Sequence, residues 1–235
     1  MDNRPHIFST RPVSPVLQDE ARQKGIRLSA HSFIEVKPIL SEAVRSAISK
    51  YLKEKITAIF TSMNAVEAVL TQANEKPDWN VGCIGHTTCE LAVRLVGREK
   101  IIATANYADE LAENILWASD GPYVFFSGNL RREVLPSIFK EHGQELDELV
   151  VYTTEMRHYQ LNETVDAIAF YSPSAVESFF TTNTLEKDVI IFAIGNTTAE
   201  SIKNFVPNPV IISSEPKKDT LVKEMIQYFY QKENA

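Results

Sequence analysis

The chain has 235 residues, of which 44% are hydrophobic and 23% are charged, and its formal net charge is −7. This composition is typical of a globular protein with one large or two small domains. No apolar run reaches the roughly 18 residues of a membrane span, and the acidic balance argues against a nucleic-acid partner. The N-terminal MDNRPHIFSTRP lacks the apolar stretch of a signal peptide, which favours a cytoplasmic location.

Taken in chain order, short apolar runs alternate with amphipathic stretches, which predicts an α/β protein with parallel sheets covered on both faces. The predicted strands lie in 6–12, 27–36, 57–60, 80–85, 100–104, 123–126, 148–154, 167–171, 189–195 and 209–213. The predicted helices lie in 14–25, 64–73, 87–96, 108–118, 129–142, 174–183, 197–205 and 219–232.

An internal repeat organises these elements. Three pairs of segments match without a gap, and in each pair the equivalent residues lie 110 positions apart. The pairs are IFTSMNAVEAVL at 59–70 with AFYSPSAVESFF at 169–180, CIGHTTCE at 83–90 with AIGNTTAE at 193–200, and EKIIATANYADEL at 99–111 with PVIISSEPKKDTL at 209–221. We therefore expect a duplication that covers about 59–116 and 169–226.

The first copy continues into two further strands, whereas the second copy stops near the C-terminus. The pair of strands that the second copy lacks is found at the N-terminus, where Phe8-Ser9 matches Phe126-Ser127. This arrangement predicts a discontinuous domain, 1–37 plus 154–235, with a second domain, 38–153, inserted into it. We expect each to be a doubly wound, flavodoxin-like parallel sheet, and the two to face each other across a cleft.

Six loops at the expected carboxyl ends of strands carry hydroxyl or small side chains where a helix begins. A helix N-terminus with a nearby hydroxyl is suited to bind an anion, although Ser and Thr also cap helices in any protein. Capping could explain any one of these loops, but the presence of six favours the interpretation that they bind a small polyanion. They contain Ser9-Thr10, Thr61-Ser62, Thr87-Thr88, Ser127-Gly128-Asn129, Ser172-Pro173-Ser174 and Thr197-Thr198.

Other chemistries find little support in the sequence. The five histidines are scattered, and Cys83 and Cys89 are spaced neither as metal ligands nor as a CxxC pair, so we expect both cysteines to be reduced. No GxGxxG, P-loop or GxSxG motif is present. Tyr152 ends a strand where the chain leaves the inserted domain, and its phenol could either donate a proton or pack the hinge. His86 is matched by Asn196 in the repeat, which favours hydrogen bonding over catalysis.

Five segments resemble, in the same order, those of the uroporphyrinogen-III synthase family over essentially the whole chain. They are IFTSMNAVEAV, SGNLRREVLP, VVYTT, YSPSAVESF and AIGNTTAESI. The resemblance implies two α/β domains joined by a two-strand connection. It also implies an enzyme that cyclises hydroxymethylbilane, a linear tetrapyrrole, to uroporphyrinogen III with inversion of ring D, and that needs no cofactor and no metal ion.

In that reaction the terminal hydroxyl leaves, the substituted carbon of ring D attacks the resulting azafulvene, and a spiro intermediate opens and recloses. The resemblance implies a catalytic role for Tyr152, in the departure of the hydroxyl. It assigns substrate binding to the loops with Ser62, Asn64, Ser127, Gly128, Asn129, Ser172, Pro173, Ser174, Gly195, Thr197 and Thr198. The repeat extends this role to Thr10, Arg11, Gly85, Thr87 and Thr88.

We expect hydroxymethylbilane to be the partner, received in a transient hand-over from porphobilinogen deaminase, and we expect a monomer with no nucleic-acid or membrane partner. Two alternatives remain at this stage. A duplicated cleft protein could be a non-catalytic binder or sensor of a small polyanion. It could also be a phosphosugar isomerase, although no Glu or His base is evident at a strand end.

Overall fold

The computed structural model describes residues 4–233, which form an α/β protein with two sheets of mainly parallel strands. The chain divides into two compact units. Unit 1 is built from both ends of the chain, up to Glu35 and from Glu155 onward, and unit 2 is Val36–Thr154.

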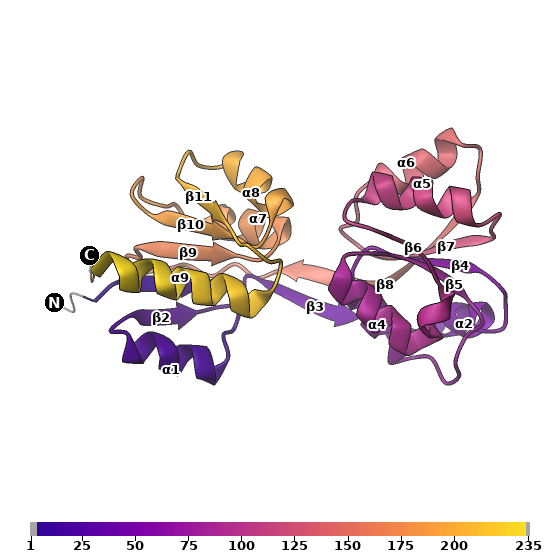
Figure 1. The fold of residues 1–235 in the computed structure, drawn as a ribbon, viewed down its shortest axis with the longest axis horizontal. Helices are drawn as coiled ribbons and strands as arrows, with labels where there is room; N and C mark the ends of the chain where they lie inside the picture. The colour runs from indigo at the N-terminus through magenta and orange to yellow at the C-terminus, as the bar shows by residue number, and fades with distance from the viewer. Residues whose placement is uncertain (1–3, 234–235) are drawn as a thin grey trace. The chain divides into compact units, whose positions relative to one another are not determined.

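In unit 1 the strand order is β11-β10-β9-β1-β2, and all neighbours are parallel. The strands are β1 (His6–Ser9), β2 (Arg27–Ala30), β9 (Ala167–Phe170), β10 (Ile190–Ala193) and β11 (Val210–Ile212). One face of this sheet is covered by α1 (Pro15–Gln23) and α9 (Lys218–Glu233), and the other by α7 (Pro173–Thr182) and α8 (Asn196–Lys203) (Figure 1). Burial on both faces explains why the central strands are apolar throughout.

In unit 2 the strand order is β3-β8-β7-β4-β5-β6. The strands are β3 (Ile34–Pro38), β4 (Thr57–Phe60), β5 (Asn80–Ile84), β6 (Ile101–Ala105), β7 (Tyr123–Gly128) and β8 (Leu146–Met156). Helices α2 (Glu42–Tyr51), α3 (Met63–Leu70) and α4 (His86–Val96) cover one face, and α5 (Ala108–Ala118) and α6 (Val134–Glu141) cover the other. A 3₁₀ turn, Arg98–Lys100, precedes β6.

The strand orders agree with the sequence repeat. In unit 2 the order β6-β5-β4-β7-β8 corresponds position by position to β11-β10-β9-β1-β2 in unit 1. The strands of the two copies therefore occupy equivalent places, although the chain enters the two sheets at different points. The pair that the second copy lacks in sequence is supplied by β1 and β2, as the repeat predicts.

Three sequence predictions need correction. The expected strand 27–36 is two strands, because β2 pairs with β1 in one sheet and β3 joins the other. Helix α2 was missed, although Ser41 caps it by accepting from the Val44 N–H. The helix expected over 129–142 begins only at Val134, because the N–H of Arg131 bonds to the carbonyl of Gly128 in a turn.

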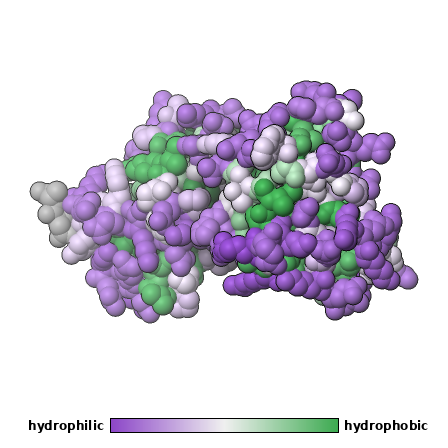
Figure 2. Space-filling view, turned by 45° about the vertical axis from the view of Figure 1, so that its right-hand side comes forward, coloured by the Kyte–Doolittle hydropathy of each residue, from purple (hydrophilic) through white to green (hydrophobic). Residues whose placement is uncertain are grey.

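No helix in the described part of the chain, residues 4–233, is long and apolar enough to cross a membrane. On the face drawn in Figure 2, hydrophilic residues separate the apolar ones into small groups.

Candidate functional site

The residues expected to bind a ligand lie at the carboxyl edge of each sheet. In each case a strand ends and a helix follows within a few residues, so parallel strands bring these loops to one edge of their own unit. Unit 1 contributes Thr10, Arg11, Ser172, Pro173, Ser174, Gly195, Thr197 and Thr198, and unit 2 contributes Ser62, Asn64, Gly85, Thr87, Thr88, Ser127, Gly128 and Asn129.

Two of the predicted serines cap helices. Ser62 Oγ accepts from the N–H of Asn64 at 3.2 Å, at the start of α3. Ser172 Oγ accepts from the N–H of Ala175 at 3.2 Å, at the start of α7, and lies 3.0 Å from Ser174 Oγ. Each cap satisfies one N–H of the first helical turn, and the N–H groups of Met63 and Ser174 have no acceptor among residues 4–233. These groups, more than the serine hydroxyls, are available to an anion.

Two other predicted hydroxyls are engaged inside the protein. Thr10 is buried, and its Oγ1 donates to the carbonyl of Ala169 at 2.8 Å. Ser127 is buried as well, and its Oγ donates to Glu148 Oε1 at 2.7 Å. Thr10 and Ser127 therefore position their loops rather than present free hydroxyls. By contrast, Arg11 is exposed, and among residues 4–233 no carboxylate lies within ion-pair distance of it.

Glu148 and Arg131 form a polar network beside Ser127 that sequence reasoning missed. Arg131 Nε donates to Glu148 Oε1 at 2.6 Å, and another guanidinium nitrogen pairs with Glu133. Burial opposes ionisation of Glu148, but hydrogen bonds from Arg131 and Ser127 outweigh it and lower the pKa of the carboxyl. The paired charge adds little negative potential to the loop. The basic segment NLRRE was visible in the sequence, but its acidic partner on β8 was not.

The repeated threonine loops differ from the serine loops, because their hydroxyls are not engaged. Thr88 and Thr198 occupy the same place in α4 and α8 and are only 8% and 3% exposed. Among residues 4–233, neither hydroxyl has a hydrogen-bond partner. Their neighbours Thr87 and Thr197 are exposed and half-buried, respectively. Two equivalent threonine pairs at helix N-termini can each donate to a carboxylate.

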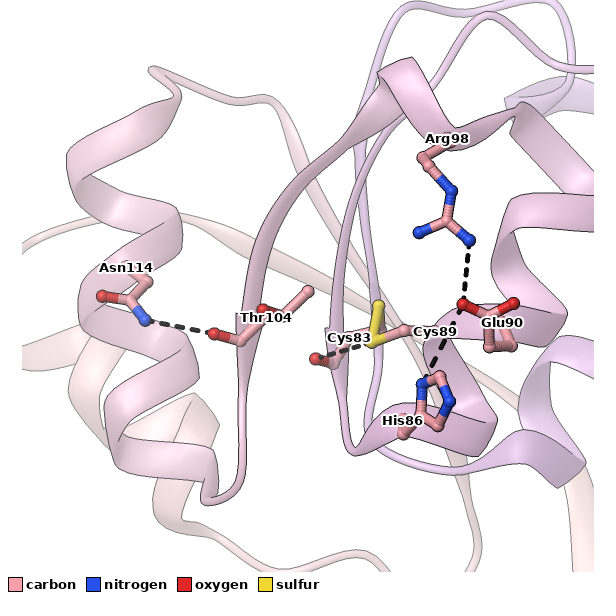
Figure 3. The surroundings of a disulfide bond; sticks show 7 residues. All are labelled: Cys83, His86, Cys89, Glu90, Arg98, Thr104 and Asn114. Carbon is pink, nitrogen blue, oxygen red and sulfur yellow. Dashed lines mark hydrogen bonds and ion pairs between the residues drawn. A yellow bond between two sulfur atoms is a disulfide. The ribbon is translucent and has the colours of Figure 1, made fainter.

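Cys83 and Cys89 form a disulfide, so the expectation that both are reduced is wrong (Figure 3). The strand end at Cys83 and the first turns of α4 at Cys89 bring the two Cα atoms to 5.4 Å, within the range that a disulfide spans. Sequence spacing alone did not reveal this proximity. Beside the disulfide, Arg98 donates to Glu90 at 2.9 Å and thereby lowers the pKa of that carboxyl. His86 is exposed and lies 3.9 Å from the same carboxylate.

Tyr152 does not end its strand as expected, because β8 continues to Met156; it lies inside β8, half-buried, with its ring against Gly128. A Cβ atom on residue 128 would come within 2.3 Å of the tyrosine Cζ, so a larger residue there would force the Tyr152 ring to move. Asn129 accepts from the N–H of Thr154 at 2.7 Å and donates to its carbonyl at 3.3 Å, which ties β7 to β8. Among residues 4–233, the Tyr152 hydroxyl has no hydrogen-bond partner.

Another tyrosine, Tyr171, directly follows β9 and has a different environment. Its hydroxyl lies 2.9 Å from Ser9 Oγ, and burial raises its pKa to about 12 even though the hydrogen bond to Ser9 and the charge of Arg11 oppose this shift. The Tyr171 hydroxyl is thus engaged with Ser9, whereas the Tyr152 hydroxyl has no partner among residues 4–233. Within residues 4–233, no group of three or more His, Cys, Asp and Glu side chains could hold a metal ion.

The chain matches a protein-family model and resembles solved structures. The family model described as uroporphyrinogen-III synthase HemD matches residues 15–223. The uroporphyrinogen-III synthetase of Helicobacter pylori is 16% identical, with a TM-score of 0.62 over 96% of this chain and 99% of that chain. A mutant uroporphyrinogen III synthase of Thermus thermophilus is 14% identical, with a TM-score of 0.71 over 97% of this chain and 99% of that chain. At these identities the structural likeness shows a shared fold.

Proposed function

The chain belongs to the uroporphyrinogen-III synthase family, and from this premise we propose that it cyclises hydroxymethylbilane to uroporphyrinogen III in haem biosynthesis. The observation that carries the proposal, besides the family, is the repeated pair of threonine loops. The hydroxyls of Thr88 and Thr198 have no partner within the described residues, and both lie where a helix begins at the carboxyl edge of a sheet. Such an edge suits the carboxylates of a linear tetrapyrrole.

The reaction requires control of geometry more than strong acid–base catalysis. The terminal hydroxyl leaves with a proton as water, and the azafulvene cation that remains is attacked by the substituted carbon of ring D. The spiro intermediate then opens and recloses with ring D inverted. Because the free substrate closes by itself to the type I isomer, the enzyme must hold ring D in the other orientation. Positioning of this kind can contribute about 7–11 kcal/mol.

We assign the positioning to loops at the carboxyl edges of the sheets. Backbone N–H groups at the starts of α3, α4, α7 and α8 face the carboxyl edges, and each such helix start stabilises an anion by about 0.3–2 kcal/mol. The hydroxyls of Thr87, Thr88, Thr197 and Thr198 add donors of the same kind. Several weak sites of this type bind a polycarboxylate without a basic patch, in keeping with the net charge of −7.

Tyr152 is the residue that we assign to departure of the hydroxyl. Its phenol is half-buried, is held in place by the close approach of Gly128, and is free of hydrogen bonds to other residues in 4–233. A phenol in this state can donate a proton to the leaving hydroxyl and thereby favour formation of the azafulvene.

We propose further that units 1 and 2 are flavodoxin-like domains, one inserted into the other, and that the protein is a cytoplasmic monomer. A transient hand-over from porphobilinogen deaminase would shorten the time in which the free substrate closes to type I. The family match does not favour the alternative of a non-catalytic polyanion binder or sensor.

The distribution of product isomers tests the function. The purified protein, coupled to a porphobilinogen deaminase that supplies fresh hydroxymethylbilane, should yield mostly type III uroporphyrin after oxidation and chromatography. Formation of type I alone, at the rate seen without the protein, would contradict the assignment.

Substitution Tyr152→Phe tests the catalytic assignment. Loss of a proton donor should lower kcat by about 100- to 10,000-fold and leave KM nearly unchanged, measured in the same coupled assay. Tyr171→Phe is the matched control, because the hydroxyl of Tyr171 is bound to Ser9 and burial raises its pKa to about 12. Unchanged turnover in the Tyr152 variant would leave this tyrosine with a structural role only.

The repeat supplies a test of the backbone N–H groups. Met63 is the first residue of α3, and the equivalent residue in α7 is Pro173. Ser62 is already extended, with φ −147° and ψ 138°, so Met63→Pro should fold normally and lose only one N–H. We expect KM for hydroxymethylbilane to rise about 2- to 30-fold.

Met63→Leu keeps the N–H at a similar side-chain volume and is the control for this substitution. Thermal unfolding should show that both variants are folded. An unchanged KM in Met63→Pro would mean that the N-terminus of α3 does not contact the substrate.

A further inference from the structure

The disulfide encloses one of the two threonine loops. Cys83 is in β5 and fully buried, and Cys89 is in α4 and half-buried. The five residues between them, 84–88, include Gly85 and Thr88, so the bond closes a small ring around a loop that we assign to substrate binding (Figure 3).

The second copy of the repeat shows that this element folds without a disulfide. The residues equivalent to the two cysteines are Ala193 and Ala199, both buried, and the same strand, glycine turn and helix form around them. A ring closed over so few residues also stabilises a fold less than a long one does. The strand, turn and helix of this element can therefore form without a disulfide.

The two copies differ in backbone conformation at the glycine of this loop. Gly85 has φ 74°, in the left-handed region, whereas Gly195 has φ −178°, which is extended. The cross-linked loop and the loop with alanines therefore direct the peptide groups beside Thr88 and Thr198 differently. The copy with the cysteine pair and the copy with alanines thus differ in the turn that leads into the helix.

The half-buried cysteine of the pair lies beside a pocket. Cys89 lines a pocket of about 390 Å³, together with His86, Glu90, Arg98 and Asn106. The Cys89 sulfur also lies 3.2 Å from the carbonyl oxygen of Cys83. A disulfide sulfur has no proton to donate, but a thiol in the same place would have an acceptor ready. The reduced pair thus fits with little rearrangement.

From these observations we propose that Cys83 and Cys89 form a reversible redox site that sets the affinity of the Gly85–Thr88 loop for substrate. The effect on affinity rests on the proposed function. In the proposed cytoplasmic location, disulfides are usually transient and redox-sensing, which agrees with a reversible bond. The closed ring holds the loop in one conformation. The oxidised form therefore binds substrate more tightly, because the loop loses less conformational entropy on binding.

The exchange needs a dithiol as reductant. One thiolate of the dithiol attacks Cys89 Sγ, the S–S bond breaks, and Cys83 leaves as a thiolate that takes up a proton. The second thiolate of the reductant then attacks the reductant sulfur that is bonded to Cys89 in the mixed disulfide. Cys89 leaves as a thiolate and takes up a proton. The protein gains two electrons and two protons, and the dithiol becomes a cyclic disulfide. A disulfide oxidant reverses the sequence.

The test compares the oxidised protein with the same protein reduced by a dithiol. Alkylation and mass measurement should find no free thiol in the first form and two in the second. Uroporphyrin III, the oxidised product, serves as the binding probe, with its fluorescence anisotropy as readout. We expect its Kd, and the KM for hydroxymethylbilane, to rise about 3- to 10-fold on reduction and to return on reoxidation.

The double variant Cys83→Ala, Cys89→Ala reproduces the residues of the second copy and is the control. Its Kd should match that of the reduced protein and should not respond to dithiol. Equal Kd values for the two wild-type forms, or free thiols in the oxidised protein, would overturn the proposal. If the protein makes no type III isomer in either form while the thiol count still changes by two, the proposed function fails and the redox site stands.

Discussion

The N–H groups in the first turn of an α-helix have no acceptor within the helix, and this constraint shapes both sheet edges of the protein. In each unit, parallel strands end at one edge of the sheet and helices begin there. The N–H groups that have no acceptor therefore lie close together at that edge. Side-chain caps from Ser62 and Ser172 use some of these donors, and the others are left for a ligand. An acidic chain can bind a polyanion in this way.

The structure separates the hydroxyls of the sequence into engaged and available groups. Thr10 and Ser127 are buried and bonded internally, and their loops owe their shape to those bonds. Thr88 and Thr198, in contrast, have no partner among the described residues. The binding capacity proposed here therefore depends less on the number of hydroxyl-bearing loops than on the two repeated elements and on backbone N–H groups.

Much of the fold was predictable because the repeat marks equivalent strands and apolar runs mark the buried ones. The unpredicted features all depend on contacts that are distant in sequence or on local geometry. Residues 27–36 read as one strand, yet two sheets share them. Glu148 in β8 pairs with Arg131 in the loop after β7, and the alternation of β8 gives no sign of this. The disulfide depends on the turn between β5 and α4, and spacing does not reveal that turn.

The claim that helix N-termini at the carboxyl edges hold the substrate is tested most directly by titrating ¹⁵N-labelled protein with uroporphyrin III and following the backbone amide resonances. The largest shifts should fall on the N–H groups of Met63, Thr87, Thr88 and Thr197. Shifts confined to the amino ends of the strands, for example around Arg27 and Asp166, would place the ligand at the opposite edge and contradict the claim.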